Sequence, residues 1–291
     1  MNRKTLDKEA LVDLHMHTCA SDGTQTPETL IEELKSKNIQ LFSVTDHDTV
    51  ASIETVKNLA EREAICFLPG VEISTSWGDV ELHILTYGVR TDDEKLLDIL
   101  NENQNIRDSH NRALILYLQS KFSKVSVDAY DAYTPEESLG GWKSLNYLLE
   151  IGVVKHMHDV FDLIKEMGTP MVFPSYQTMI PKLKALGYTL VLAHPPAYLK
   201  GECLDVTFLD ELVALGMDGI ECYSPYYRED DADSRAFYLE YCQANHLYVT
   251  SGSDAHGTFT KNRAIGKPKT PLKALKLDFL KQYFTALDEQ F

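Results

Sequence analysis

The chain has 291 residues, of which 44% are hydrophobic, enough to bury one large α/β domain or one domain with an insertion. Its 44 acidic residues outnumber 28 basic ones and give a formal net charge of -16, so we expect binding neither to long nucleic acids nor to anionic membranes. No apolar run reaches the ~18 residues of a bilayer span, and the scattered cysteines form no CxxC motif, which predicts a cytoplasmic protein with reduced thiols.

Strands and amphipathic helices alternate through the first third of the chain. After the first apolar run, Thr26-Pro27-Glu28 supplies a helix N-cap, a first-turn proline and an early acid. This alternation is typical of a parallel sheet or barrel. The elements expected next are a helix from 29 to 38, a strand over 41–45, a helix over 51–62 and strands over 65–73 and 80–88.

The alternation stops at about Asp92, where a long helical pattern runs to Ser120 and a mixed segment follows. We predict that residues 96–173 form a mostly helical insertion that caps the active site, while residues 1–95 and 174–291 form the main domain. The elements expected after the insertion are helices over 175–186, 204–215, 231–245 and 272–287, and strands over 189–193, 219–223 and 247–251.

Six apolar runs carry or end in a histidine or a carboxylate. A buried strand normally ends in a turn, and an imidazole there is costly unless something binds it. Repeated around a sheet, this pattern directs many ligands to one place and predicts a metal enzyme. The six runs are 10–18, 41–48, 67–72, 80–85, 190–195 and 249–256.

Two His-x-His pairs test this interpretation. His15 and His17 follow a strand, where alternate residues face the same side, so both rings can reach one ion. His156 and His158 lie on a helical pattern, where residues two apart face different ways. We therefore predict metal binding for the first pair and solvated or packed histidines for the second.

The other candidate ligands are chosen by position. Glu72 directly follows the apolar FLPGV, where an unpaired carboxylate would be expensive to bury. His83 lies inside a strand, so a satisfied core histidine is the alternative, and Asp22 sits in a Ser-Asp-Gly turn that it could simply form. The remaining candidates, all at strand ends, are His47, His194, Asp254 and His256.

Six ordered motifs together resemble the polymerase and histidinol phosphatase (PHP) family. They are DxHxH at 13–17, TDHD at 45–48, GVE at 70–72, HxLxYG at 83–88, LAHP at 192–195 and GSDAHG at 252–257. The chain is most similar to the stand-alone phosphoesterase branch that includes nucleoside 3',5'-bisphosphate phosphatases. This resemblance implies a distorted seven-stranded (β/α) barrel with the site at the strand C-termini.

The resemblance also implies two to three divalent metal ions. Six imidazoles with three carboxylates favour Mn, with Fe or Zn as alternatives, over Ca or Mg, which prefer all-oxygen shells. Such ions would attract a small phosphorylated substrate despite the acidic surface. The ligand sets implied are His15, His17, Glu72 and Asp254 for one ion, Glu72, His83 and His194 for a second, and Asp22, His47 and His256 for a third.

We therefore predict hydrolysis of a small phosphate monoester, such as a nucleotide or nucleoside bisphosphate. The expected nucleophile is a hydroxide that bridges two ions. Two alternatives stay open: a hydrolase of a non-phosphate bond, as in the related amidohydrolase barrels, and a metal-bearing binding protein without catalysis. The residues expected to hold the hydroxide through the ions are His15, His17, Glu72, His83, His194 and Asp254.

Substrate contacts are harder to place, because the chain departs from the bisphosphate phosphatases in the stretches expected to grip phosphate. Those enzymes carry Gly-Arg-x-His in the insertion, an arginine after LAHP and a histidine after the GIE strand; here the stretches are 141–144, 195–198 and 224–228. Solvated cations and packing of the insertion are the alternatives to each candidate. The candidates are the cations Lys143, Lys200 and Arg228 and the aromatic residues Trp142, Tyr198, Tyr226 and Tyr227.

Three aspartates beside the motif histidines, Asp13, Asp46 and Asp48, have two equally weighted interpretations. They could orient the ligand histidines through hydrogen bonds. They could instead only form the turns in which they lie.

Overall fold

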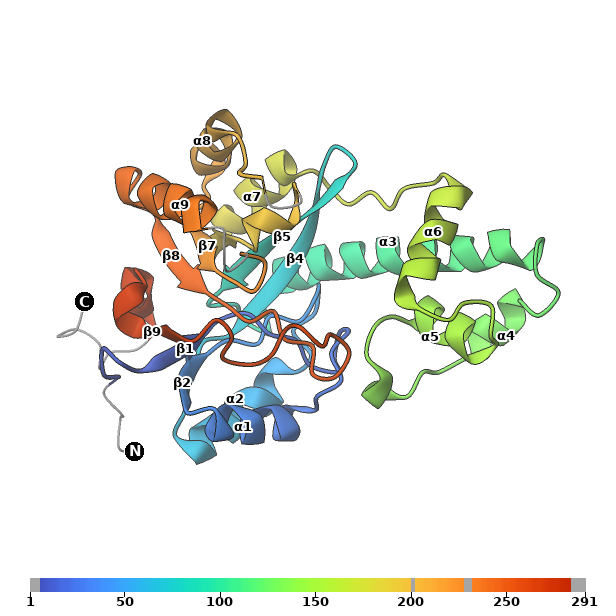
Figure 1. The fold of residues 1–291 in the computed structure, drawn as a ribbon, viewed down its shortest axis with the longest axis horizontal. Coiled ribbons are helices and arrows are strands. Elements are labelled where there is room, and N and C mark those ends of the chain that lie inside the picture. The colour runs from blue at the N-terminus through green and yellow to red at the C-terminus, as the bar shows by residue number, and fades with distance from the viewer. Residues whose placement is uncertain (1–5, 200–201, 228–231, 284–291) are drawn as a thin grey trace.

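The computed structural model describes residues 6–199, 202–227 and 232–283, and its strands form two sheets (Figure 1). The first sheet has the order β3-β2-β1-β9 and the second the order β4-β5-β6-β7-β8. The strands are β1 (Leu11–Asp13), β2 (Ile39–Phe42), β3 (Cys66–Phe67), β4 (Gly70–Trp77), β5 (Val80–Tyr87), β6 (Thr189–Leu192), β7 (Gly219–Tyr223), β8 (Tyr248–Ser251) and β9 (Thr270–Pro271).

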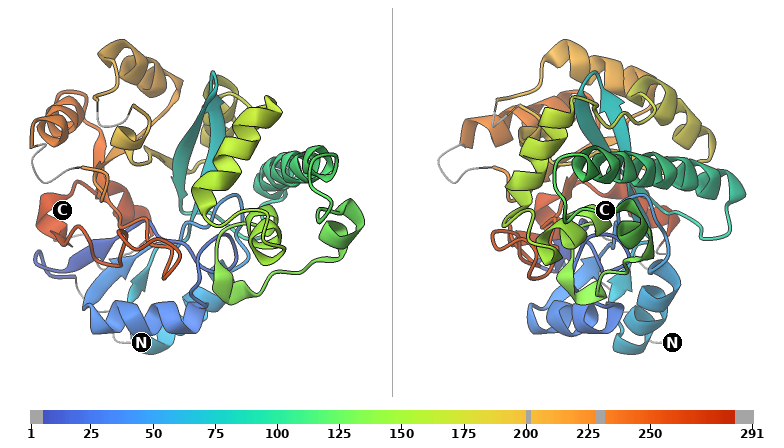
Figure 2. Two further views of the ribbon diagram at one scale, coloured as in Figure 1. Left: turned by 45° about the vertical axis from the view of Figure 1, so that its right-hand side comes forward. Right: turned by 90° about the vertical axis from the view of Figure 1, so that its right-hand side faces the viewer.

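Helices cover the outer faces of these sheets. Figures 1 and 2 show α1 and α2 against the first sheet and α7, α8 and α9 around the second. No helix among the described residues is long and apolar enough to cross a membrane. The helices are α1 (Pro27–Ser36), α2 (Ile53–Glu63), α3 (Glu94–Gln119), α4 (Val127–Ala132), α5 (Lys143–Glu150), α6 (Met157–Met167), α7 (Tyr176–Ala185), α8 (Val206–Leu215) and α9 (Ala232–Ala244).

The mixed α/β class is confirmed, but a closed seven-stranded barrel is not. Between the two sheets the described residues form only single β-bridges, Met16 with Ala255 and His47 with Glu72. The expected parallel order also fails in the second sheet, because β5 pairs antiparallel with both β4 and β6. A short turn after Trp77 explains the first reversal, since two strands joined so closely form a hairpin.

Two predicted elements were wrong in detail. The strand expected over 65–73 is divided into β3 and β4 around Pro69, which has no N–H to give to a ladder. The helix expected over 272–287 is replaced, as far as residue 283, by two short 3₁₀ turns. Between these turns Lys276 pairs with Val249 through two backbone hydrogen bonds, which a continuous helix would break. Residues 284–287 lie outside the described residues.

Helix α3 belongs to two hydrophobic cores. Near its start, Leu96 and Leu100 pack in the large core of the second sheet. Near its end, Leu114 and Leu118 pack with α5 and α6 in a separate core. Figure 1 shows α3 running from the sheets out to α4, α5 and α6. The division into residues 1–95 with 174–291 and an insertion 96–173 stays a prediction, and α3 crosses its first boundary.

Candidate metal centre

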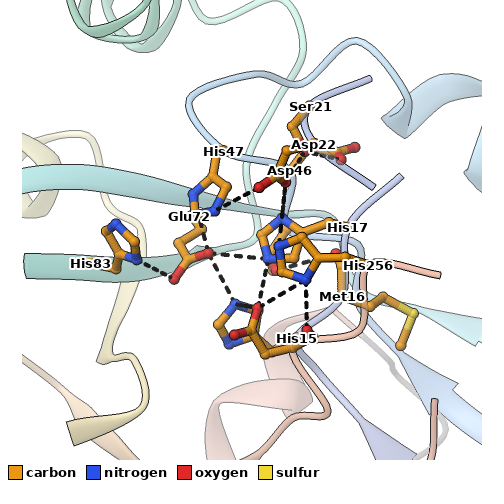
Figure 3. Close-up of polar contacts among 12 residues, drawn as sticks. His15, Met16, His17, Ser21, Asp22, Asp46, His47, Glu72, His83 and His256 are labelled. Carbon is orange, nitrogen blue, oxygen red and sulfur yellow. Dashed lines mark hydrogen bonds and ion pairs between the residues drawn. The ribbon is translucent and has the colours of Figure 1, made fainter. Parts of the chain in front are cut away.

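The nine predicted ligand residues lie in one cluster, and Figure 3 labels seven of them. His194 and Asp254 join the cluster through contacts with Glu72 and His17. His15 and His17 follow β1 and are fully buried, and Asp254 and His256 follow β8 on the neighbouring segment. The bridge between Met16 and Ala255 holds these two segments side by side. Alternation along an extended chain then directs residues 15 and 17 to the same side, as predicted from the sequence.

Glu72 lies at the centre of the cluster. Its fully buried carboxylate has five imidazole nitrogens within 3.3 Å, whereas a carboxylate offers only about four lone-pair positions. Two atoms that share an ion through bonds of about 2.1 Å lie roughly 3.0 to 3.5 Å apart, so these distances fit ligand atoms around metal ions. The contacts are His15 at 3.0 Å, His17 at 3.2 Å and His47 at 3.3 Å on Oε2, and His83 at 3.0 Å and His194 at 3.1 Å on Oε1.

The first ligand group, expected from the family resemblance, is present as a unit. Its ligand atoms, from His15, His17, Glu72 and Asp254, all lie within 4.8 Å of one another. Asp254 Oδ1 is 3.0 Å from Nε2 of His17 and 3.4 Å from Nε2 of His15. All four residues are buried, so water could not reach an ion here through the side chains that bind it.

The second group lies on the other oxygen of Glu72. The Nε2 atom of His194 is 3.4 Å from Nδ1 of His83, and both nitrogens contact Glu72 Oε1. His47 also meets the spacing for this group, which the sequence assigned to the third ion alone. His15 and His17 thus contact one oxygen of Glu72 while His83 and His194 contact the other, the arrangement that a bridging ligand needs.

The third group surrounds Asp22. Its Oδ1 atom is 3.4 Å from Nε2 of His256, and its Oδ2 atom is 3.9 Å from Nε2 of His47. The Nδ1 atom of His17 is 3.8 Å from Asp22, so His17 meets the spacing for this group as well. Among the described residues these are the three groups with metal-ligand spacing, counting His194 with the second.

Buried nitrogens without hydrogen-bond partners support metal binding. The Nδ1 atoms of His17 and His47, which lie 3.8 Å from Asp22 and 3.3 Å from Glu72 Oε2, are buried and make no hydrogen bond. An unpartnered polar atom in a protein interior carries a desolvation cost, which a metal bond would remove. The donor set of six imidazoles and three carboxylates therefore fits borderline divalent ions such as Mn, Fe or Zn.

In the metal-free cluster the pKa values of the histidines are shifted in both directions. Burial opposes a charge on His17, but hydrogen bonds with the Asp254 and Glu72 carboxylates outweigh it and raise its pKa to about 9. Burial opposes a charge on His83 too, and the Glu72 charge with further acidic contacts raises its pKa to about 10. The pKa of His47 instead falls to about 3, because burial and its histidine neighbours outweigh the carboxylates. The metal-free site thus holds protons that a metal ion must displace.

Two glutamates that orient ligand histidines were missed in the sequence. Glu221 is fully buried in β7 and lies 3.1 Å from Nδ1 of His15 through Oε1. Glu81 in β5 lies 3.1 Å from Nε2 of His83. Glu221 carried a usable signal, because it is a carboxylate inside an apolar strand, the same signal that selected Glu72. Such contacts fix the ring orientation of metal-ligating histidines.

The three aspartates near the motif histidines accept hydrogen bonds from backbone N–H groups and from side chains of neighbouring segments. Asp13 accepts the N–H groups of Ser253 and Gly266. Asp46 accepts both the N–H and the hydroxyl of Thr18. Their recorded hydrogen bonds include no ligand imidazole, which favours the turn-forming interpretation.

Asp48 plays a comparable part toward α3. Its carboxylate accepts from the N–H of Ser74, from the Asn103 amide and from the Arg107 guanidinium. Arg107 also reaches Glu81 at 3.4 Å, so one arginine of α3 links the Asp48 turn to the glutamate beside His83. This role of Arg107 was not predicted, because residues 96–173 were expected to form the insertion.

The predicted substrate contacts are scattered. Tyr227 is buried in the large core with its hydroxyl on the Glu221 carbonyl, and Lys143 donates to the Asp131 carbonyl within the insertion. Trp142 packs near Phe161, at 5.7 Å between ring centres. Lys200 and Arg228 lie outside the described residues. Packing, which is the alternative interpretation of the aromatic residues, therefore explains the position of Tyr227 in the large core and the contact of Trp142 with Phe161.

Two other aromatic candidates do adjoin the metal groups. The Tyr198 hydroxyl accepts the N–H of His83 at 3.0 Å, and its ring is 5.5 Å from the His194 ring. The Tyr226 ring is 5.0 Å from His194, and its hydroxyl donates to Asp254. These tyrosines therefore surround the ligands.

The insertion touches the metal centre directly. Gly141 donates its N–H to the carbonyl of Asp22 at 2.7 Å. Both Gly140 and Gly141 have positive φ, and a Cβ at Gly140 would lie 2.9 Å from that same carbonyl. Glycine is required for this close approach. The segment around Gly141 thus contacts a candidate ligand residue, while an insertion that caps the site stays a prediction.

Comparisons with known proteins agree with this site. Residues 13–140 match the model of the PHP domain family. A 3',5'-nucleoside bisphosphate phosphatase from Chromobacterium violaceum is 28% identical over 262 residues, covering 88% of this chain and 91% of that protein. The 5'-3' exoribonuclease Rnm of Salmonella typhimurium is 28% identical over 259 residues, covering 84% and 85%. A solved structure from Bifidobacterium adolescentis, classed as a metal-dependent phosphoesterase, has a TM-score of 0.75 at 25% identity and covers 94% of both chains.

The family match and the geometry concern the same residues. The matched segment contains six of the nine ligand residues, and the other three complete the groups that those six begin. The relatives match most of the length of the chain. The chain is therefore similar to PHP domain proteins, through the match of residues 13–140 to the family model and through relatives that cover most of its length.

Proposed function

We propose that this protein is a metal-dependent phosphoesterase that hydrolyses a small phosphate monoester, with a nucleotide or nucleoside bisphosphate as the first substrate class to test. The observation that carries the proposal is the Glu72 carboxylate, which has five imidazole nitrogens within 3.3 Å divided between its two oxygens. When bound, the ions would supply acidified water and neutralise charge on phosphoryl oxygens.

The residues divide this work by position. Glu72 holds the first and second groups at a fixed spacing, while Glu221 and Glu81 orient His15 and His83. Asp22, with His256, carries the third group at the edge where Gly141 of the insertion makes contact. We propose Mn as the resident metal, because the donor set combines imidazole nitrogens with carboxylate oxygens.

Charge explains how an acidic protein would accept an anion. Three divalent ions bring six positive charges, against one negative charge each from Asp22, Glu72 and Asp254. A phosphate dianion is therefore attracted locally, although the whole chain carries a formal charge of -16. The same net charge opposes long nucleic acids, and the relative named an exoribonuclease makes a 5'-phosphorylated RNA the most informative competing substrate.

A phosphate-release assay with added Mn tests the proposal. The panel contains nucleoside 3',5'-bisphosphates, nucleoside monophosphates and a short 5'-phosphorylated RNA, together with amide and lactone substrates for the alternative of a non-phosphate hydrolase. Asp254→Asn and His83→Ala should abolish turnover, whereas His158→Ala, which changes an exposed histidine outside the site, should not. A protein that holds Mn but releases no phosphate from any substrate would contradict the proposal.

A further inference from the structure

The two oxygens of Asp254 face different surroundings. Oδ1 lies among the imidazoles of the first group, 3.0 Å from Nε2 of His17. Oδ2 accepts a hydrogen bond from the Tyr226 hydroxyl at 2.8 Å and another from an Arg263 NH group at 2.7 Å. Only Oδ1 is therefore free to serve as a ligand.

Tyr226 and Arg263 form one unit. The Arg263 guanidinium carbon lies 4.8 Å from the centre of the Tyr226 ring. The ring centres of Tyr226 and His194 are 5.0 Å apart, and His194 belongs to the second group. Tyr226 thus contacts Asp254 of the first group with its hydroxyl and His194 of the second group with its ring.

Asp254 needs support of this kind. Its backbone has a φ of 48°, in the left-handed region that L-residues rarely adopt. Its side chain is almost fully buried, while that of Arg263 is partly exposed. Two hydrogen bonds to one carboxylate oxygen, one of them from a cation, are strong enough to fix its rotation.

We propose that Tyr226 and Arg263 are positioning residues for the metal centre, a proposal that rests on the function proposed above. They hold Asp254 so that it binds the first ion through Oδ1 alone, and Tyr226 fixes this ligand relative to His194. Tyr226 lies in the stretch 224–228, where the chain departs from the bisphosphate phosphatase pattern. We infer that a residue in this stretch orients a metal ligand.

Mn binding to the purified protein without substrate tests the proposal, with free Mn measured by electron paramagnetic resonance. Tyr226→Phe keeps the ring and removes the hydroxyl, and Arg263→Gln removes the cation. We expect each to weaken one Mn site by ~10-fold to 100-fold and to leave the others unchanged. Arg263→Lys, which can still supply one charged donor to Oδ2, should recover part of the loss. The control is Arg235→Gln, because Arg235 also lies near tyrosine rings, those of Tyr223 and Tyr227.

The Arg263→Gln variant distinguishes a positioning role of Arg263 from a purely electrostatic effect on Mn binding. Removing a positive charge beside a cation site should tighten Mn binding if Arg263 acts only through its charge. Tighter or unchanged binding in this variant would overturn the proposal. Equal weakening of every site, with a lower unfolding temperature of the metal-free variants, would assign the pair a general structural role and would also overturn it. Wild-type protein that binds Mn but releases no phosphate would refute the proposed function alone.

Discussion

Nδ1 of His15 lies 3.1 Å from Oε1 of Glu221, and the other oxygen of that glutamate accepts the backbone N–H of His194 at 2.9 Å. One buried carboxylate therefore fixes a ligand ring and the backbone of a second ligand. Because the two ligands follow different strands, Glu221 also ties the strand ends together.

Glu221→Gln should weaken metal binding by ~10-fold to 100-fold and lower phosphatase activity at limiting Mn. The amide retains the shape of the side chain but loses the charge that orients the His15 ring. Mn content after dialysis against a fixed free concentration measures the effect. Glu240→Gln, at an exposed position of α9, is the control and should match the wild type.

Metal binding should release protons. The pKa values of about 9 for His17 and about 10 for His83 mean that both rings are protonated at pH 7.5 in the metal-free protein. A metal ion can bind only after they lose these protons, so Mn affinity should rise with pH until about pH 9 to 10. Calorimetry in two buffers of different ionisation enthalpy should show at least two protons released per chain at pH 7.5. An identical apparent enthalpy in both buffers would contradict this.

Gly252→Ala should disrupt the site by steric contact. A Cβ at this position would lie 2.1 Å from His15 Cβ and 2.4 Å from Glu221 Oε1, so His15 or Glu221 must move. We expect loss of bound metal and activity. Gly187→Ala is the control, because a Cβ there meets open space and only the positive φ is strained. The control should lose about 1 kcal/mol of stability and keep its metal.

Two arginines of α3 should contribute unequally to stability. Arg107 pairs with the fully buried carboxylate of Asp48, whereas Arg112 pairs with an exposed carboxylate, Asp131. Arg107→Gln leaves the Asp48 charge buried without its cation and should cost about 1.5 to 3 kcal/mol of unfolding free energy. Arg112→Gln should cost much less, because water screens an exposed ion pair. Urea denaturation of both variants measures the difference, and equal losses would contradict the assigned roles.

The candidate ligand residues could be selected from the sequence because polar side chains in apolar runs are conspicuous. A histidine or carboxylate inside or at the end of an apolar strand has few inexpensive explanations, and Glu72, His83 and His194 do lie together in one cluster. Glu221 satisfies the same argument, because it is a fully buried carboxylate inside the apolar strand β7, although it is not among the predicted ligands. The local sequence was therefore more informative than the motif list.

Features that depend on distant contacts were not predictable. The antiparallel β4, β5 and β6 pairing, the 3₁₀ turns after residue 271 and the hydrogen bond from Gly141 to Asp22 all arise from tertiary packing. The same holds for Arg263, whose partner Asp254 is nine residues away along an irregular segment without periodicity. Hydrophobic patterns carry no information on such partners.

Helix α3 has a consequence for how this protein could be cut or recombined. Its first turns complete the large core, its last turns complete the core of the insertion, and Arg107 between them holds the Asp48 turn. A variant that lacks residues 96–173 would lose the predicted insertion and, with it, the α3 residues that pack in the large core. Any exchange of caps between relatives should therefore keep the helix through Arg107 as part of the recipient and place the junction beyond it.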